Sequence, residues 1–353
     1  MQIRLASDKD IHSWDDYVTR NEHASPYHQY AWRKSVESAY GMPGIYLMAF
    51  DGDNNVVGVL PSIMIKTPFS SQNLCTLPYC DRGEAIADSE DVKQALVREL
   101  VAEAKRNNVK SITYRGAENL HHDDEIEDAA YQDRKVRMIL DLPESSDALL
   151  KGFKAKLRSQ INKAKKNGLS FSIGNNAKKL DSFYQVFTQN MRDLGSPTHS
   201  KKWFQSIVEK FGDNCVISIV YYQDIPVGAG LILINGSTAA IPWASTLRSH
   251  NRLAPNMLLY WSLLEHATDL GCKRFDFGRS TYGEGTYRFK QQWGAKPYPL
   301  LWEEIDVATG CSTTLTSKPG VSKLRTYLET IWQRIPLAIT VWLGSGIRKY
   351  ISL

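Results

Sequence analysis

The chain has 353 residues, the length of two ordinary domains. With 42% hydrophobic and 23% charged residues and a modest net charge of +5, its composition excludes an intrinsically disordered chain. Five cysteines without a C-x-x-C pair argue against a disulfide scaffold or a zinc module. Neither a signal peptide nor a stretch of ~20 apolar residues is visible, so we expect a cytoplasmic protein.

The first half of the chain predicts a β-hairpin, then a helix and a further strand. Strands over 44–50 and 56–65 flank the turn sequence Asp51-Gly52-Asp53-Asn54-Asn55. A helical pattern over 92–106 leads to a strand over 111–114. The sequence His121-His122-Asp123-Asp124 offers metal-ligating groups. Adjacent side chains in an acidic run are more typical of a solvent-facing loop, so we expect no metal site.

The second half repeats this order of elements. Strands over 216–222 and 227–234 form a hairpin, and a strand over 239–245 leads to a helix over 255–269 and a strand over 274–277. This pattern predicts an α/β (α+β) fold of two similar subdomains with mixed sheets, over 1–147 and 148–311, followed by a linker and C-terminal helices over 312–353. Arg252 precedes the helix that starts at Pro255, and an arginine there could hold an anion; a polar loop is the alternative.

A basic segment separates the two halves. Residues 148–180 include nine lysines or arginines and no Asp or Glu. Ser145-Ser146-Asp147 predicts the start of a helix and Gly168 its end, so we expect a single helix. Its cations include Lys154 and Arg158, and the missing carboxylates favour contact with a polyanion; a solvated surface helix is the alternative. Its apolar stripe consists of Phe153, Leu157, Ile161 and Ala164.

Residues 276–293, D-F-G-R-S-T-Y-G-E-G-T-Y-R-F-K-Q-Q-W, are the most informative for function. A strand is expected to end at Gly278 and pass into a polar loop, after which a helix carries Arg288 and Lys290. Two fixed cations favour an anionic substrate or a developing negative charge. The spacing around Ser280 does not fit a G-x-S-x-G nucleophile elbow, and the glycines do not form a dinucleotide motif. The segment therefore favours transfer of an activated group between two bound substrates without a covalent enzyme intermediate.

The C-terminal residues predict amphipathic helices. A polar linker over 312–320 precedes apolar residues at helical spacing from Leu324 to Ile335. Pro336 ends this pattern, and an apolar run over 337–343 leads to a basic end. We expect these helices to dock on the body of the protein. A position at a membrane interface, supported by Trp342 and the flanking cations, is the alternative.

Three segments resemble the FemAB family, the peptidoglycan bridge-forming aminoacyltransferases built from two acetyltransferase-like (GNAT) subdomains. They are the basic segment 154–168, the strand-loop-helix segment 275–294 and the N-terminal sequence Pro26-Tyr27-His28-x-x-x-Trp32. Residues 331–337 and 343–344 resemble the FemAB-related proteins found with exosortase and exopolysaccharide systems.

The resemblance implies a twin GNAT fold and transfer of an aminoacyl or acyl group to an amine of a peptidoglycan or exopolysaccharide precursor. The acceptor would be a small-molecule or lipid-linked anionic precursor at the inner face of the membrane. The donor stays open between aminoacyl-tRNA and acyl-CoA, because the chain shows neither the long charged helical hairpin of several tRNA-using members nor a glycine-rich pyrophosphate loop. We expect no tightly bound cofactor and no DNA partner. A non-catalytic protein that binds an anionic glycan or lipid-linked precursor is the alternative.

The resemblance also assigns roles to residues. It implies that Lys290 stabilises the donor's phosphates or the oxyanion of a tetrahedral intermediate, and that Arg288 and Arg279 hold anionic groups. By position, Asp276 is a candidate base and Tyr287 a candidate hydrogen-bond donor; a structural carboxylate and aromatic packing are the alternatives. The other predicted substrate-binding residues are Ser280, Trp293, Lys154, Arg158 and Arg252.

Overall fold

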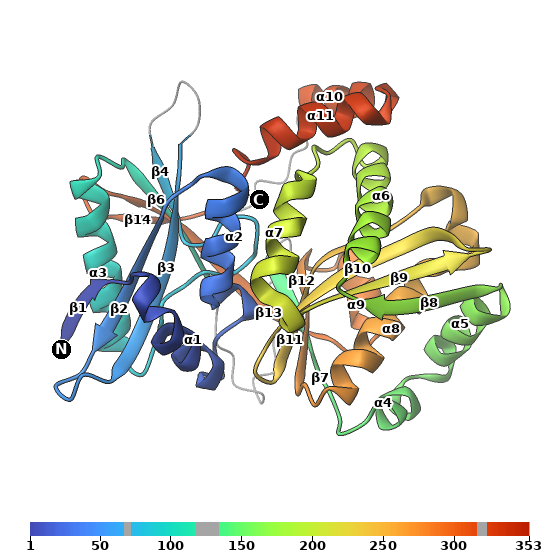
Figure 1. Ribbon diagram of the computed structural model, residues 1–353, viewed down its shortest axis with the longest axis horizontal. Helices are drawn as coiled ribbons and strands as arrows, with labels where there is room; N and C mark the ends of the chain where they lie inside the picture. Colours follow the sequence, from blue (N-terminus) through green and yellow to red (C-terminus); the bar gives the residue numbers. More distant parts are fainter. Residues whose placement is uncertain (67–71, 118–133, 316–322, 353) are drawn as a thin grey trace.

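The computed structural model describes residues 1–66, 72–117, 134–315 and 323–352. Within these residues, fourteen strands form one continuous mixed sheet, with helices on both of its faces (Figure 1). The strands are β1 (Gln2–Leu5), β2 (Gly44–Phe50), β3 (Val56–Ile65), β4 (Asn73–Cys75), β5 (Ile86–Ala87), β6 (Ser111–Ala117), β7 (Lys135–Asp141), β8 (Leu169–Gly174), β9 (Cys215–Tyr222), β10 (Ile225–Asn235), β11 (Thr238–Thr246), β12 (Arg274–Thr281), β13 (Lys296–Asp306) and β14 (Ser312–Thr314).

Eleven α-helices and two of the 3-10 turns in the described residues matter below. The helices are α1 (Ile11–Arg20), α2 (Tyr30–Tyr40), α3 (Glu90–Arg106), α4 (Ser146–Gly152), α5 (Ala155–Lys166), α6 (Ala177–Asp193), α7 (Lys201–Phe211), α8 (Pro255–Asp269), α9 (Gly285–Gln291), α10 (Lys323–Arg334) and α11 (Leu337–Arg348). The turns are η2 (Pro26–His28) and η5 (Arg248–Leu253). The metal-ligating residues considered at 121–124 lie outside the described residues.

The repeated order of elements predicted from the sequence is confirmed. The hairpins β2–β3 and β9–β10 form; the first is followed by β4, β5, α3 and β6, and the second by β11, α8 and β12. Local chemistry explains the helix ends: the Ser89 hydroxyl accepts from the backbone N–H of Val92 at the start of α3, and Pro255 occupies the first turn of α8. Gly271, at a φ of +85°, follows the end of α8.

β13 joins the two halves into one sheet. Its first residues pair with β7 in the second half, and its last residues pair with β6 in the first half (Figure 1). β7 in turn pairs with β12. β7 therefore lies before residue 147 in the sequence but pairs with β12 of the second half, and β13 lies after it but pairs with β6 of the first half.

Three hydrophobic cores hold these layers together. A core shared by both halves lies between the sheet and α1, α2, α6 and α7, where the rings of Trp32 and Trp203 meet at 5.4 Å. A second core lies between the strands of the second half and α5, α8 and α9, and a third lies beneath α3. Because α2 packs on α7 across the shared core, the two halves cannot separate without exposing large aromatic side chains.

The basic segment forms two helices, not the predicted single one. α4 ends at Gly152, Phe153 is extended with ψ of 147°, and α5 starts at Ala155. The break lets the buried Phe153 ring reach the second core, 5.5 Å from Trp293. Arg158 then donates to the carbonyls of Lys151 and Phe153. Burial of the aromatic ring stabilises the fold by more than the helical hydrogen bonds that are lost at the break.

β12 also differs from the prediction. It does not end at Gly278 but continues to Thr281, so Arg279 and Ser280 are strand residues that pair with β7. The polar loop before α9 is therefore shorter than expected. The cause is a β-bulge, described below, which accommodates Gly278 as an extra residue while the strand continues.

α10 and α11 lie against α6 (Figure 1). Thr340 and Gly344 are the buried residues of α11. No helix of the described residues is long and apolar enough to cross a bilayer.

Candidate functional site

A β-bulge in β12 forms the centre of the candidate site. Asp276 pairs with Ile139, whereas Arg279 pairs with Arg137, so β12 contains one more residue than β7 between these positions. Gly278 takes the left-handed φ of +72° that the bulge requires.

The side chains of Asp276 and Lys290 hold this bulge in place through hydrogen bonds to its backbone. The Asp276 Oδ1 atom accepts from the backbone N–H of Gly278 at 2.8 Å. Lys290 Nζ, on α9, donates to the carbonyls of Gly278 and Arg279 at 2.9 and 2.7 Å. Burial lowers the pKa of Lys290 to about 8, although Asp81 and Asp276 act in the opposite direction. The ammonium is thus a buried cation with two of its three protons engaged.

The first half of the chain supplies a carboxylate to the same place. Asp81 Oδ2 accepts from the backbone N–H of Arg279 at 3.0 Å, and Oδ1 lies 3.7 Å from the Arg279 Nε. The Trp302 ring, on β13, contacts the guanidinium groups of both Arg115 and Arg279, each 5.0 Å from its centroid. The bulge is therefore held by residues from both halves.

Sequence reasoning missed Asp81. The signal was the run Cys80-Asp81-Arg82-Gly83-Glu84, in which opposite charges alternate within an otherwise apolar stretch. Charges in such a context are buried only when they are paired or bind a ligand.

Two buried arginines and one further carboxylate, Glu84, extend the cluster. Arg82 forms an ion pair with Glu84, and Arg137 Nη1 lies 3.9 Å from Asp276 Oδ2. Burial lowers the pKa of both guanidinium groups and raises the pKa of Asp276, against the pull of the neighbouring Arg137. Among the described residues, the Nε atoms of both arginines and Oε2 of Glu84 have no hydrogen-bond partner. Unpaired buried groups of this kind can receive a polar ligand.

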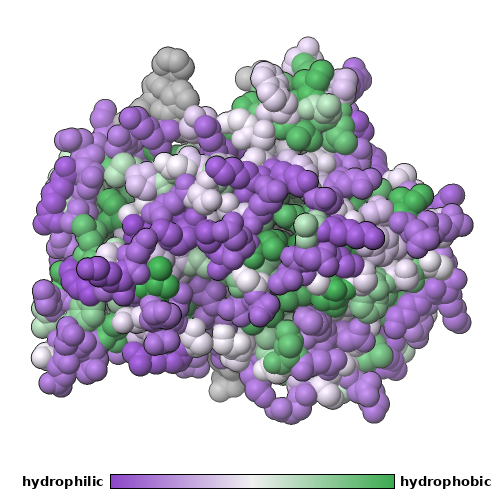
Figure 2. Space-filling view, in the orientation of Figure 1, coloured by the Kyte–Doolittle hydropathy of each residue, from purple (hydrophilic) through white to green (hydrophobic). Residues whose placement is uncertain are grey.

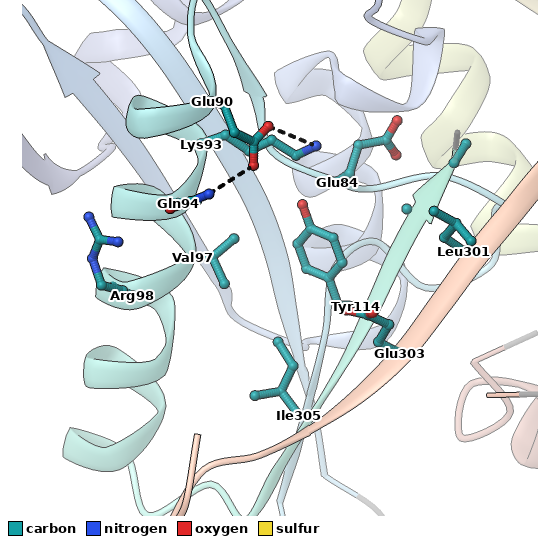
Figure 3. A pocket seen from close by; sticks show the side chains of 12 residues that line it. Glu84, Glu90, Lys93, Gln94, Val97, Arg98, Tyr114, Leu301, Glu303 and Ile305 are labelled. Carbon is teal, nitrogen blue, oxygen red and sulfur yellow. Dashed lines mark hydrogen bonds and ion pairs between the residues drawn. The ribbon is translucent and has the colours of Figure 1, made fainter. Parts of the chain in front are cut away.

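Three adjoining hollows, which we call the charged groove, lead to this cluster. The first, of about 430 Å³, lies between α3 and the β6–β13 pair (Figure 3). Glu84, Tyr114 and Leu301 line one side of it, and Val97 and Arg98 the other (Figure 3). The second hollow, of about 180 Å³, shares Glu84 with the first and contains Arg82. The third, of about 30 Å³, shares Arg82 with the second and ends at Arg137 and Asp276.

The backbone beside the bulge is also open to a ligand. β11 and β12 run parallel, but their pairs extend only from Thr238–Ala240 to Arg274–Asp276. β11 continues to Thr246 along β10. Among the described residues no further pair joins β11 to β12, so the edge of β11 beyond Ala240 can offer N–H and C=O groups to a substrate beside the bulge.

The predicted site residues fall into two groups. Four of them meet at the bulge: Lys290, Asp276, Arg279 and Ser280. The buried Ser280 Oγ has no partner among the described residues. Nearby on α9, the buried Tyr287 ring packs on Tyr282 at 4.6 Å, and its hydroxyl accepts from Gln291 Nε2 at 3.4 Å.

The other predicted residues lie elsewhere. Arg288 is exposed on α9, and Trp293 is buried in the second core. Lys154 is exposed at the start of α5, Arg158 binds backbone carbonyls there, and Arg252 is exposed in η5. None of these five lines the charged groove. In the described residues no group of three or more His, Cys, Asp or Glu side chains could hold a metal ion.

Comparisons with known proteins identify the fold. A family model described as "Acetyltransferase (GNAT) domain" matches residues 151–291. The crystal structure of FemX has a TM-score of 0.67 at 13% identity, covering 95% of this chain and 100% of its own. L-PGS from Bacillus licheniformis has a TM-score of 0.53 at 10% identity, covering 94% and 99%. A tandem GNAT protein from the clavulanic acid biosynthesis pathway has a TM-score of 0.51 at 12% identity, covering 87% and 98%.

No curated protein matches the sequence significantly. The matched GNAT domain lies within the second half of the chain, and the structural likenesses confirm the predicted pair of GNAT-like subdomains. The expected resemblance to the FemAB family is matched by the likeness to FemX. The association with exosortase and exopolysaccharide systems stays a prediction.

Proposed function

We propose that the protein transfers an activated aminoacyl or acyl group directly to an amine of a cell-envelope precursor at the bulge of β12. The observation that carries this proposal is the buried cluster at the bulge, to which both halves contribute charges and from which the charged groove leads outward. The GNAT domain and the likeness to FemX and L-PGS support it.

The reaction needs a base and a fixed acyl group. The acceptor's amine nitrogen forms a bond to the activated carbonyl carbon, and the bond from that carbon to the donor's oxygen or sulfur breaks. Asp276 takes the amine proton on Oδ2, because Oδ1 is occupied by Gly278 N–H. Burial raises the pKa of this carboxyl, which makes its carboxylate a stronger base. The leaving oxygen or sulfur of the donor then takes up this proton from Asp276, and the carboxylate is restored.

Lys290 acts first as a positioning residue. Its two bonds to backbone carbonyls fix the bulge, and its remaining proton and charge can stabilise the oxyanion of the tetrahedral intermediate. Arg82 and Arg137, with their unpaired Nε atoms, bind an anionic group of the acceptor at the inner end of the charged groove. The residues proposed to bind the donor are Tyr287, Arg288 and the cations of α5.

The donor is an aminoacyl-tRNA or an acyl-CoA. We infer that it approaches along the unpaired edge of β11, since polar groups of the donor can form hydrogen bonds with backbone groups there. We further propose a peptidoglycan or exopolysaccharide precursor, free or lipid-linked, as the acceptor, and a location at the inner face of the membrane.

Mass spectrometry of precursors incubated with the protein and a panel of aminoacyl-tRNAs and acyl-CoAs tests this proposal. A mass gain identifies both the donor and the transferred group. Asp276→Asn should lower the rate of transfer by about 10²–10⁴-fold and remove the rise of the rate with pH that deprotonation of Asp276 causes. Asp224→Asn, the same change in the exposed β9–β10 turn, is the matched control. Tight binding of a precursor without any mass gain would support a non-catalytic binding protein instead.

A further inference from the structure

The C-terminal helices expose an unusual number of apolar side chains. Trp342 is 74% exposed, Tyr327 63% and Leu328 56%. Figure 2 shows this as a hydrophobic area over α10 and α11, at the upper right of the molecule. We call these side chains the outer face. It consists of Tyr327, Leu328, Ile331, Ile339 and Trp342.

The opposite side of the same helices is fixed to the body. A Cβ atom on Gly344 would lie 2.8 Å from the backbone nitrogen of Thr198, so α11 touches the segment after α6 through its backbone. A Cβ atom on Gly195 would lie 2.8 Å from the Cβ of Glu329 in α10. Such close approach leaves no room for the helices to turn over. The outward direction of the apolar side chains is therefore set by the fold.

The residues after α11 form further hydrogen bonds between the C-terminal segment and the body of the protein. The backbone N–H of Tyr79 and the Arg115 guanidinium both donate to the carbonyl of Ser352, at 2.6 and 2.9 Å. The Tyr79 hydroxyl donates to the carbonyl of Lys349. Arg115 is fully buried beside the bulge region, so the C-terminal segment is bonded to the interior of the protein.

A hollow with two cations lies beside the outer face. It has a volume of about 600 Å³ between the end of α2, the start of α7 and α11. Trp342 and Ile347 line it together with Lys202 and Lys349, and no carboxylate of the described residues does. Arg334, the last residue of α10, is also exposed. An apolar face with a tryptophan at its edge and cations beside it matches the interface of a bilayer that contains anionic lipids.

We propose that the outer face docks on an anionic phospholipid bilayer, with Trp342 among the lipid headgroups and Lys202 and Lys349 on lipid phosphates. The two helices of 12 residues each are too short to span a bilayer, so they lie in its plane. A second copy of the chain fits less well, because a two-fold contact through this face would bring the lysines of both hollows together. The docking does not depend on the proposed transfer reaction.

Cosedimentation with vesicles tests this docking in the absence of substrates. The full chain should bind phosphatidylcholine vesicles that contain phosphatidylglycerol, and bind pure phosphatidylcholine vesicles weakly. Trp342→Ala should weaken binding at least about tenfold, because burial of a large aromatic side chain in the interface is lost. Lys202→Gln combined with Lys349→Gln should reduce the dependence on phosphatidylglycerol and on salt.

Ile225→Ala is the matched control, since Ile225 is 52% exposed but lies in the β9–β10 hairpin. Circular dichroism confirms that each variant is folded. Wild-type protein that does not bind anionic vesicles, or Trp342→Ala protein that binds them as the wild type does, would overturn the proposal. A dimer that forms through this face without vesicle binding would assign it to a second copy of the chain. Transfer to a water-soluble acceptor is measured separately, so each proposal can fail alone.

Discussion

Replacing Lys290 by methionine tests the arrangement at the bulge most directly. Burial lowers the pKa of this ammonium from its ordinary value of 10.5 to about 8. A difference of this size corresponds to about 3 kcal/mol between the two protonation states. The variant keeps the length of the side chain but loses both the charge and the two bonds to the carbonyls of Gly278 and Arg279.

The sign of the pH dependence follows from these two pKa values. Below pH 8 both the folded and the unfolded chain hold the Lys290 proton, so this group gives stability no pH dependence. Between pH 8 and 10.5 the folded protein has released a proton that the unfolded chain still holds, so the free energy of unfolding rises with pH. The Lys290→Met protein lacks this rise. The difference in stability between wild type and variant should therefore grow by about 2–3 kcal/mol from about pH 7.5 to about pH 10.

Urea unfolding of both proteins at the two pH values measures this difference. At neutral pH the substitution leaves two carbonyls without a hydrogen bond, at a cost of about 1–3 kcal/mol each. It also removes a buried charge, which acts in the opposite direction, so the stability difference at neutral pH alone is less informative than its change with pH. Lys296→Met removes an exposed ammonium on β13 and controls for the loss of one positive charge. An equal difference between wild type and Lys290→Met at both pH values would refute the buried, carbonyl-bound ammonium.

Three further substitutions test the fold around the site. Gly278→Ala should destabilise the protein by about 1–2 kcal/mol in thermal unfolding, because the φ of +72° at this position is unfavourable for alanine. The control Gly152→Ala, in open space at the end of α4, should be neutral or stabilising. Phe153→Ala should cost about 3–5 kcal/mol in urea unfolding, because it empties a buried site between two tryptophans. Glu84→Gln should cost about 3–5 kcal/mol, since it leaves the buried Arg82 without its counter-charge; an unchanged midpoint would show that this pair is open to solvent.

Local signals in the sequence predicted the elements well. The hairpin turns, the proline at the start of α8 and the glycine after its end act over a few residues, and the structure confirms them. The helix that carries Lys290 was also predictable from its sequence pattern. The break at Phe153 was not, because it depends on where a distant core can receive an aromatic ring.

Some residues of the candidate site could likewise be predicted from the sequence, and others could not. Asp276, Arg279 and Lys290 could be found because they lie within one segment of 15 residues whose pattern marks a strand and a helix. Asp81 and Arg137 could not, since they reach the bulge only through pairing between strands far apart in the sequence. No local preference encodes which strand lies beside which.

The sequence by itself determined the class of fold, the order of its elements and the segment that carries the central cations. Only the tertiary structure decided that β13 joins both halves into one sheet, that Gly278 forms a bulge within a strand, and that the outer face of α10 and α11 points away from the body. The physical reason is the range of the forces involved. Turns and helix caps are set by neighbouring residues, whereas strand partners, bulges and buried charges are set by what the whole chain can bury together.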